Sequence, residues 1–198
     1  MVTYTEIFGD NPWWRSEEEI NEDAKIKEWE TSNIQWNPRI RYTFDYSNDI
    51  IYSLRGPRQV GKTTLIKIQI REFLQKGILP WSIMYYAFDI DNTPKDLVKV
   101  IENYLDRSKR QRGNNRAYLF LDEVSSIKDW QKCLLSACPL SGKEALIIFH
   151  QKLLNHRVTS GNLQPFMGDV SLSRIVGRFS SLPITSNSPI TPDISNLF

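Results

Sequence analysis

Apolar and polar positions alternate along the first 132 residues in a way that predicts strands and helices in turn. Short apolar, β-rich runs indicate strands, and apolar residues at helical spacing indicate helices. The predicted strands cover 49–54, 83–88 and 117–121, and the predicted helices cover 16–29, 63–76 and 94–107. Strands that alternate with helices favour parallel pairing in a sheet that is covered on both faces. We therefore predict the α/β class: a three-layer domain with a parallel sheet, an N-terminal helical arm and an irregular C-terminal tail.

Several predicted elements carry end signals. The Ser-Glu-Glu-Glu string at 16–19 has the form of a capping box, so the first helix is expected to begin there and run to about Trp29. Gly77 is the predicted stop of the second helix. The third helix presents one apolar face, made of Leu97, Val98, Ile101 and Leu105. A further apolar run at 145–149 is a candidate fourth strand.

A phosphate-binding loop is predicted between the first strand and the second helix. The string Gly-Pro-Arg-Gln-Val-Gly-Lys-Thr at 56–63 matches the pattern G-x-x-x-x-G-K-[ST] at every fixed position. Glycines let the backbone curl until successive N–H groups point into one anion-sized hollow, and the following helix adds its own free N–H groups and positive dipole end. The predicted phosphate-binding residues are Gly56, Pro57, Arg58, Gln59, Val60, Gly61, Lys62, Thr63 and Thr64.

Within this loop two side chains have specific predicted roles. Lys62 reaches the β- and γ-phosphates, and the Thr63 hydroxyl is a ligand for Mg²⁺. A chance match in a glycine-containing turn is the alternative. The strand before the loop and the helix after it favour the phosphate-binding interpretation.

Two carboxylates follow the third predicted strand. In a parallel sheet ligands bind outside the carboxyl ends of the strands, which is expected to bring Asp122 beside the phosphate loop. Asp122 is the predicted second holder of Mg²⁺, through water, and Glu123 is the predicted general base for the attacking water. A strand that simply ends in solvated acids is the alternative. The sequence lacks the Asn-Lys-x-Asp guanine-reading string, so ATP is favoured over GTP.

Composition and charge narrow the class of protein. The net charge of +2 is nearly balanced, so charge alone favours neither nucleic acid nor a membrane as partner. No apolar run approaches the roughly 20 residues that a membrane helix needs. Two cysteines, Cys133 and Cys138, are too few for a disulfide framework. We expect a cytoplasmic protein.

The composition changes near residue 132. All six tryptophans and all eight tyrosines lie within residues 1–132, whereas both cysteines and both histidines lie after residue 132. The stretch from residue 161 onward is rich in Gly, Ser, Pro, Asn and Thr and has no sustained period, which favours an irregular or disordered tail. We therefore divide the chain into an N-terminal arm (1–46), a partial ATPase core (47–150) and the tail (151–198).

The combined motifs resemble the AAA-type P-loop ATPase domain of a group of archaeal and bacterial ATP-binding proteins, which often have a C-terminal domain of unknown function. The resemblance covers roughly residues 10–132. Its motifs are Asn-Pro-Trp-Trp at 11–14, the loop at 55–64, Tyr-Tyr-Ala-Phe-Asp at 85–89 and Leu-Phe-Leu-Asp-Glu-Val at 119–124 followed by Trp130. It implies a module that binds ATP and Mg²⁺ and hydrolyses ATP.

The chain departs from this family pattern after residue 149. Such domains continue with a strand that bears a polar sensor, often in a Thr-Gly-Ser-like turn, and then with an arginine-containing stretch. Here His150-Gln151-Lys152 follows the candidate fourth strand. Our hypothesis is a shift of the coding frame after Lys132, which would leave a truncated ATPase; translation of the other two frames tests it.

Alternative interpretations stay open beside an active ATPase. One is a nucleotide-binding fragment or interaction module, catalytically impaired by a missing sensor and arginine finger. Another is a nucleic-acid-associated ATPase that uses the basic cluster at 109–116, although a solvated loop explains that cluster. Arg58 is either a loop cation or a contact to phosphate or to a neighbouring subunit of a homo-oligomer. Cys133, Cys138, His150 and His156 have near-zinc-finger spacing, but free thiols and solvated imidazoles are favoured.

Overall fold

The structure is a computed structural model that describes residues 4–35, 37–44, 46, 50–56, 59–137, 144–151 and 171–176. These residues form a five-stranded sheet in the order β2-β3-β4-β1-β5. The strands are β1 (Ile50–Gly56), β2 (Ile83–Ala87), β3 (Ala117–Asp122), β4 (Glu144–Gln151) and β5 (Ser171–Val176). The pairs β1–β4, β3–β4 and β2–β3 are parallel, whereas β5 runs antiparallel to β1.

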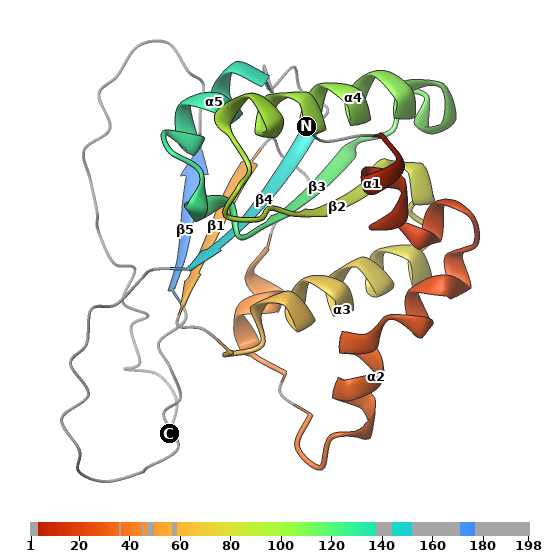
Figure 1. Cartoon of the computed structure of the whole chain (residues 1–198). Helices are drawn as coiled ribbons and strands as arrows, with labels where there is room; N and C mark the ends of the chain where they lie inside the picture. Colours follow the sequence, from red (N-terminus) through yellow and green to blue (C-terminus); the bar gives the residue numbers. More distant parts are fainter. Residues whose placement is uncertain are drawn as a thin grey trace, which may run out of the picture.

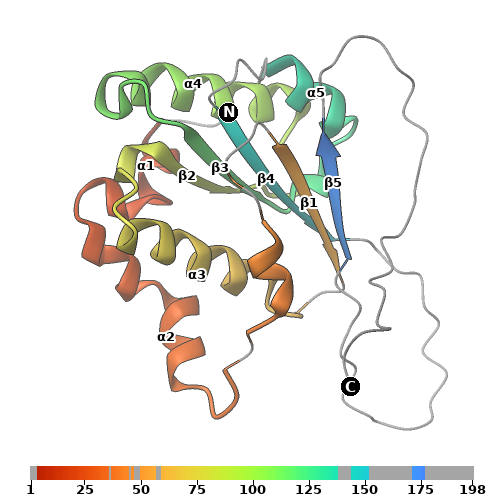
Figure 2. The same cartoon turned by 180° about the vertical axis from the view of Figure 1, so that it is seen from behind.

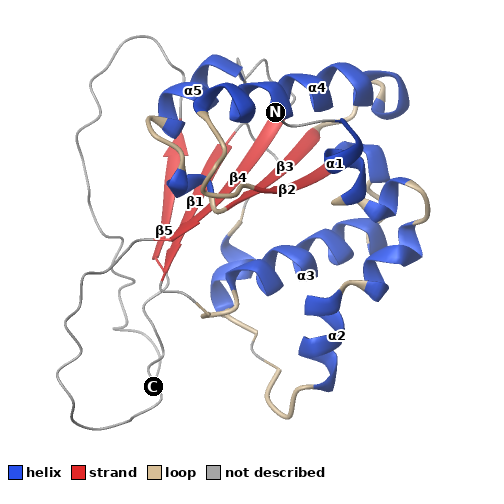
Figure 3. Cartoon of the chain, in the orientation of Figure 1, coloured by secondary structure: helices blue, strands red, loops and turns tan. Residues whose placement is uncertain are grey.

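Helices cover both faces of this sheet. The helix α3 (Lys62–Gln75) lies on one face, and α4 (Pro94–Arg112) and α5 (Trp130–Ala137) lie on the other (Figures 1 and 2). The colouring in Figure 3 makes the helix–sheet–helix layering visible. The predicted three-layer α/β fold with a parallel sheet is confirmed for β1 to β4; the antiparallel edge strand β5 was not predicted.

The sheet core is apolar on both faces, as expected for buried parallel strands. Leu119, Phe120 and Leu121 of β3 have no exposed surface. On the α3 side, Phe73 packs against Phe120 and Tyr118, with ring centroids 5.9 and 4.8 Å apart. These contacts fix α3, and with it the loop at its N-terminus, against the sheet.

The helix α3 ends where the sequence predicted. Gly77 has a φ of +77°, a left-handed conformation that glycine adopts without steric cost. The Gly77 N–H donates to the Leu74 carbonyl at 2.8 Å, and the Ile78 N–H donates to the Phe73 carbonyl at 3.0 Å. This is a Schellman ending, and it confirms Gly77 as the stop.

The prediction of one N-terminal helix at 16–29 is wrong in one respect, because the helical conformation is interrupted at Asp23. A 3₁₀ segment, η2 (Glu17–Glu22), precedes the helix α2 (Ala24–Thr31). Ser16 makes no capping bond to the backbone; instead its hydroxyl contacts the Glu18 carboxylate. Asp23 is the real N-cap, since its carboxylate accepts the Lys25 N–H at 2.8 Å. The arm also contains α1 (Tyr4–Gly9), η1 (Pro12–Trp14) and η3 (Arg39–Thr43).

The helix α4 is five residues longer than predicted, because the basic cluster belongs to its last turn. Lys109, Arg110 and Arg112 lie there, where cations compensate the helix dipole, and Gly113 then ends the helix with a φ of +57°. Arg112 is buried and donates to the Ser108 hydroxyl and the Asn115 carbonyl. The prediction of a loop at 109–112 is therefore wrong, because these residues are helical, whereas the predicted exposure to solvent is confirmed for 109–111 and not for Arg112.

The start of α4 yields a stability prediction. Thr93 and Asp96 form a reciprocal capping box: the Asp96 N–H donates to the Thr93 hydroxyl, and the Thr93 N–H donates to the Asp96 carboxylate at 3.0 Å. We expect Thr93→Ala to lower the free energy of unfolding by about 1 kcal/mol in a urea titration. Thr31→Ala, at the exposed end of α2, is the control; an equal loss in both variants would contradict the capping role.

The candidate fourth strand is confirmed as β4, between β3 and β1. The segment predicted as an irregular tail contributes β5, whose Leu172 lies opposite Leu54 of β1. Apolar and polar residues alternate only weakly in β5, and its serines are not typical of a strand, so the sequence alone does not predict it. The rest of the tail lies outside the described residues, and the boundaries of the three chain segments stay predictions. Within the described part, no helix combines the length and apolarity needed to cross a bilayer.

Candidate nucleotide-binding site

The predicted phosphate loop connects the end of β1 to the start of α3. Gln59 and Gly61 have positive φ angles of 61° and 81°, so the backbone turns sharply before the helix. The Gly61 carbonyl accepts the Leu65 N–H at 2.9 Å, which makes Gly61 the N-cap of α3. Pro57 and Arg58, two of the predicted phosphate-binding residues, lie outside the described residues.

The side chain of Lys62 folds back across this loop. Its Nζ donates to the Gly56 carbonyl at 3.1 Å, and the residue is only 6% exposed. Burial lowers the pKa of Lys62, and the carboxylates of Glu123 and Asp122 oppose this shift. A cation thus lies over the backbone turn, with two acidic groups close enough to act on it.

Asp122 ends β3 and lies against the first turn of α3. Its Oδ2 accepts a hydrogen bond from the Thr63 hydroxyl at 2.7 Å, and its Oδ1 accepts the Glu123 N–H at 3.0 Å. Burial raises the pKa of this carboxyl, whereas the bonds from Thr63 and Glu123 and the charge of Lys62 lower it. The fold thereby brings together Thr63 and Asp122, which are 59 positions apart in sequence.

Glu123 has an unusual backbone conformation. Its φ of 55° and ψ of 22° lie in the left-handed region, which costs a residue with a Cβ about 1 kcal/mol. The chain then turns into the 3₁₀ segment η5 (Val124–Ser126). Glu123 is half-buried, and its carboxylate acts electrostatically on Lys62. A strained acidic residue therefore stands beside the phosphate loop, at the carboxyl end of the sheet.

A sequence profile of an AAA domain matches residues 48–166, which is more than half of the 198-residue chain. The chain belongs to the AAA domain family. Comparison with curated proteins and with solved structures gives no match. As an AAA domain, the chain is a nucleotide-binding domain of the P-loop type, as the resemblance implied. The match continues beyond Lys132; the frame-shift hypothesis stays a prediction.

The register of the AAA domain sheet places the end of β4 beside the phosphate loop. Gln151 lies opposite Gly56 of β1, and Ile148 lies opposite Leu121 of β3. The carboxyl end of β4 therefore lies between the ends of β1 and β3, next to where the resemblance implies a polar sensor. The side chains of β4 lie outside the described residues, so the identity of the sensor stays open.

The donor set of Thr63 and Asp122 fits a magnesium ion. Both side chains offer hard oxygen atoms and are already in contact, and Mg²⁺ is usually held by one or two such groups together with phosphates and waters. Within the described residues, no three His, Cys, Asp or Glu side chains gather into a metal-binding group. The arrangement thus suits an ion that arrives with a nucleotide. Cys138 and His156 of the discounted zinc set lie outside the described residues.

Two side chains near Asp122 escaped the sequence analysis. The Tyr85 hydroxyl donates to Asp122 Oδ2 at 3.5 Å, and the buried Lys67 lies within electrostatic range of the same carboxylate. A signal for Lys67 was present, because it is a charged residue between Ile66 and Ile68 on a helix that is buried on two sides. Tyr85 belongs to the Tyr-Tyr-Ala-Phe-Asp string that the family resemblance includes, but nothing in the sequence indicates its contact with Asp122.

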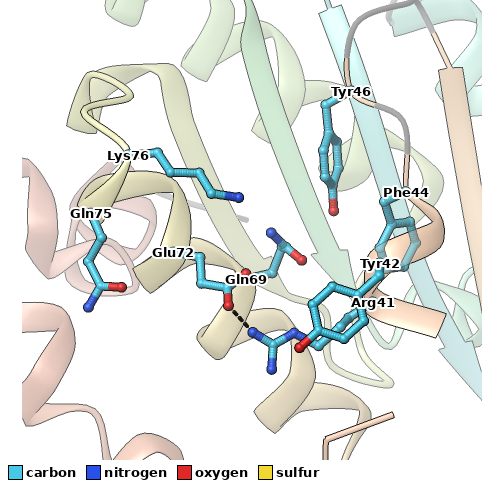
Figure 4. Close-up of a pocket in the computed structure, with 8 residues that line it drawn as sticks. All are labelled: Arg41, Tyr42, Phe44, Tyr46, Gln69, Glu72, Gln75 and Lys76. Atoms are coloured by element: carbon cyan, nitrogen blue, oxygen red, sulfur yellow. Dashed lines mark hydrogen bonds and ion pairs between the residues drawn. The ribbon is translucent and has the colours of Figure 1, made fainter. Parts of the chain in front are cut away.

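A separate hollow of about 410 Å³ lies at the other end of α3 (Figure 4). The residues that line it include the ion-paired Arg41 and Glu72 and also Tyr46 and Lys76. The hollow is lined by the C-terminal half of α3, whereas the phosphate loop is at the N-terminus of the helix. We therefore assign it no part in nucleotide binding.

Proposed function

We propose that this AAA domain binds ATP together with Mg²⁺ and hydrolyses the terminal phosphate. The observation that carries the proposal is the hydrogen bond from the Thr63 hydroxyl to the Asp122 carboxylate, with the Lys62 ammonium group beside both. A hydroxyl, a carboxylate and an ammonium group at one turn are the set that polyphosphate and its counter-ion require.

Binding rests on the loop and on Lys62. The N–H groups at the start of α3 and the helix dipole attract an anion. Lys62 now donates to the neutral Gly56 carbonyl. A phosphate oxygen is a stronger acceptor for an ammonium group than a peptide carbonyl is. When ATP binds, Lys62 therefore gives up its hydrogen bond to the Gly56 carbonyl and donates to the β- and γ-phosphates. Because Lys62 is buried, this charge-assisted bond is screened little by solvent.

Thr63 and Asp122 would hold the magnesium ion, which when bound neutralises part of the charge on the phosphates. The Thr63 hydroxyl offers a lone pair, and Asp122 offers its carboxylate either directly or through water. The Glu123 N–H on Asp122 Oδ1 keeps the carboxylate from rotating.

Glu123 acts on the attacking water. One of its carboxylate oxygens accepts a proton from the water while the water oxygen forms a bond to the γ-phosphorus. The bond from the γ-phosphorus to the bridging oxygen breaks in line, so ADP leaves with that electron pair and inorganic phosphate is released. The backbone turns at Glu123, which has left-handed angles, so Glu123 is not part of β3 as Asp122 is.

A second candidate is nucleotide binding with little turnover. The sequence favours it at one place, because β4 ends in His150-Gln151 and Lys152 comes next, where the family pattern has a Thr-Gly-Ser-like turn. In phosphoryl transfer, loss of a charge-stabilising arginine alone costs roughly 10³-fold or more in rate. Measured turnover separates this candidate from the first.

The binding half of the proposal is tested with Lys62→Ala. We expect the dissociation constant for ATP to rise by about 10- to 100-fold, since a charge-assisted hydrogen bond is worth about 1.5–3 kcal/mol. Equilibrium titration with a fluorescent ATP analogue measures this change. The matched control is Lys76→Ala, an exposed lysine just after the opposite end of α3. If Lys62→Ala folds and binds ATP as tightly as the wild type, the proposal is wrong.

A further inference from the structure

A buried lysine links the N-terminal arm to the candidate site. Lys67, on α3, is 7% exposed, and its Nζ lies 3.2 Å from Asp23 Oδ2 and 3.6 Å from the centroid of the Tyr85 ring. Burial lowers the pKa of this amine, whereas the charges of Asp23, Asp10 and Asp122 raise it. The Lys67 ammonium group thus interacts electrostatically with three carboxylates: Asp23 and Asp10 of the arm, and Asp122 at the end of β3.

Tyr85 connects this cation to Asp122 by geometry. In the β2–β3 register Ala87 lies opposite Asp122, so Tyr85 is the diagonal neighbour of Asp122 on the same face of the sheet. Its ring packs on Lys67, and its hydroxyl donates to Asp122 Oδ2, the oxygen that also accepts from Thr63. Burial raises the pKa of the Tyr85 hydroxyl, so the group stays protonated and remains a donor.

The arm holds Tyr85 from its other side. β2 is an edge strand, and the Asn11 side chain takes the place of a missing neighbour. Asn11 Nδ2 donates to the Tyr85 carbonyl at 2.8 Å, and the Tyr85 N–H donates to Asn11 Oδ1 at 2.6 Å. Figure 1 shows the red and orange arm beside β2 and α3. The backbone, the ring and the hydroxyl of Tyr85 are therefore each fixed by a separate contact.

A role in folding alone would need only the arm contacts. The Lys67–Asp23 pair holds the arm to α3, and the Asn11 amide holds it to β2. Neither requires the Tyr85 hydroxyl to reach Asp122 or the ammonium group to lie within range of that carboxylate. In metal sites, groups that contact a ligating carboxylate without touching the metal control the orientation and the charge of that carboxylate. The contacts of Tyr85 and Lys67 with Asp122 are of this kind.

We propose that Tyr85 and Lys67 are positioning residues that orient Asp122 for Mg²⁺, and that the arm residues Asn11 and Asp23 keep them in place. The inference rests on the proposed function, because it assigns to Asp122 a share in holding the ion. It extends the site to the arm, which lies outside the phosphate loop and the acidic pair.

The test measures how Mg²⁺ changes nucleotide binding in Tyr85→Phe, which removes one hydroxyl. A fluorescent ATP analogue is bound first in EDTA and then with increasing Mg²⁺, without any need for turnover. Loss of a group that hydrogen-bonds to a metal ligand typically costs about 10- to 100-fold in metal affinity. We expect the Mg²⁺ concentration at half-saturation to rise by less, about threefold, because 3.5 Å is long for a hydrogen bond. Binding in EDTA is expected to be unchanged.

The matched control is Tyr104→Phe, which removes the hydroxyl of another buried tyrosine, on α4, that donates to the Trp81 carbonyl. Its Mg²⁺ dependence is expected to equal that of the wild type. Lys67→Met is the second variant, with an expected rise of roughly tenfold in half-saturating Mg²⁺. Circular dichroism establishes that each variant is folded.

The outcomes separate the two proposals. If Tyr85→Phe and Lys67→Met respond to Mg²⁺ as the wild type does, the positioning role is overturned while nucleotide binding stands. If Tyr85→Phe and Tyr104→Phe shift equally, the effect is one of stability and the positioning role is again overturned. If the wild type binds no nucleotide in EDTA or in Mg²⁺, the proposed function falls and the positioning role falls with it.

Discussion

Replacing Glu123 by glutamine is expected to lower the rate of phosphate release from ATP by about 10²- to 10⁴-fold, the usual contribution of a general base. Glutamine has the same shape but cannot accept the proton of the attacking water. The dissociation constant for ATP should change little, because Lys62 and the loop amides carry the binding. Single-turnover phosphate release and equilibrium nucleotide binding, measured on the same preparation, give the two quantities.

Asp91→Asn is a suitable control for this substitution, since Asp91 is an exposed acid in the turn after β2. Its turnover should equal that of the wild type. Equal turnover in Glu123→Gln and the wild type would remove Glu123 from the mechanism. A wild-type chain that binds ATP without releasing phosphate would favour the second candidate, a binding module.

Replacing Asn11 by alanine is expected to lower the free energy of unfolding by roughly 3–5 kcal/mol. Asn11 is fully buried and makes three hydrogen bonds, one to the Ile7 carbonyl at 2.6 Å and two to the backbone of Tyr85. Alanine would leave both the Tyr85 N–H and carbonyl unpaired inside the protein, and each such group costs about 1–3 kcal/mol. Urea unfolding followed by tryptophan fluorescence measures the loss.

A second asparagine provides the comparison. Asn92 accepts one hydrogen bond, from the Asp89 N–H at 2.6 Å, in a turn that water reaches. Its replacement by alanine should cost no more than about 1 kcal/mol, because water can take over the bond. If Asn11→Ala were as mild as Asn92→Ala, the Asn11 amide would not serve as the missing neighbour of β2.

The parts of the fold that the sequence predicts correctly are those determined by residues close together in the chain. The helix that follows the loop depends on neighbouring residues, and its stop at Gly77 depends on one backbone conformation. Asp122 and Glu123 follow an apolar strand closely enough to be recognised as its end. The position of Asp122 beside Thr63 followed from the general geometry of parallel sheets.

The parts that were missed depend on contacts between distant residues. Asn11 meets Tyr85 across 74 positions, and no spacing rule connects them. The basic last turn of α4 looked like a loop because the buried partners of Arg112, Ser108 and the Asn115 carbonyl, are visible only in three dimensions. The capping box at Ser16 is predicted from residue types alone, and in the structure the Ser16 side chain makes no capping bond. The Asp23 carboxylate caps α2 instead, because it accepts a backbone N–H.

The way the arm closes the edge of β2 bears on where the functional unit begins. The AAA match starts at residue 48, yet the indole N–H groups of Trp13 and Trp14 both donate to the Ile83 carbonyl on that edge. A fragment limited to 48–166 would leave the backbone N–H and C=O groups along the free edge of β2 uncovered. A strand of a second molecule could then pair with this edge, so the fragment would tend to self-associate. Recombinant fragments of this AAA domain should therefore start upstream of Asn11 to remain monodisperse.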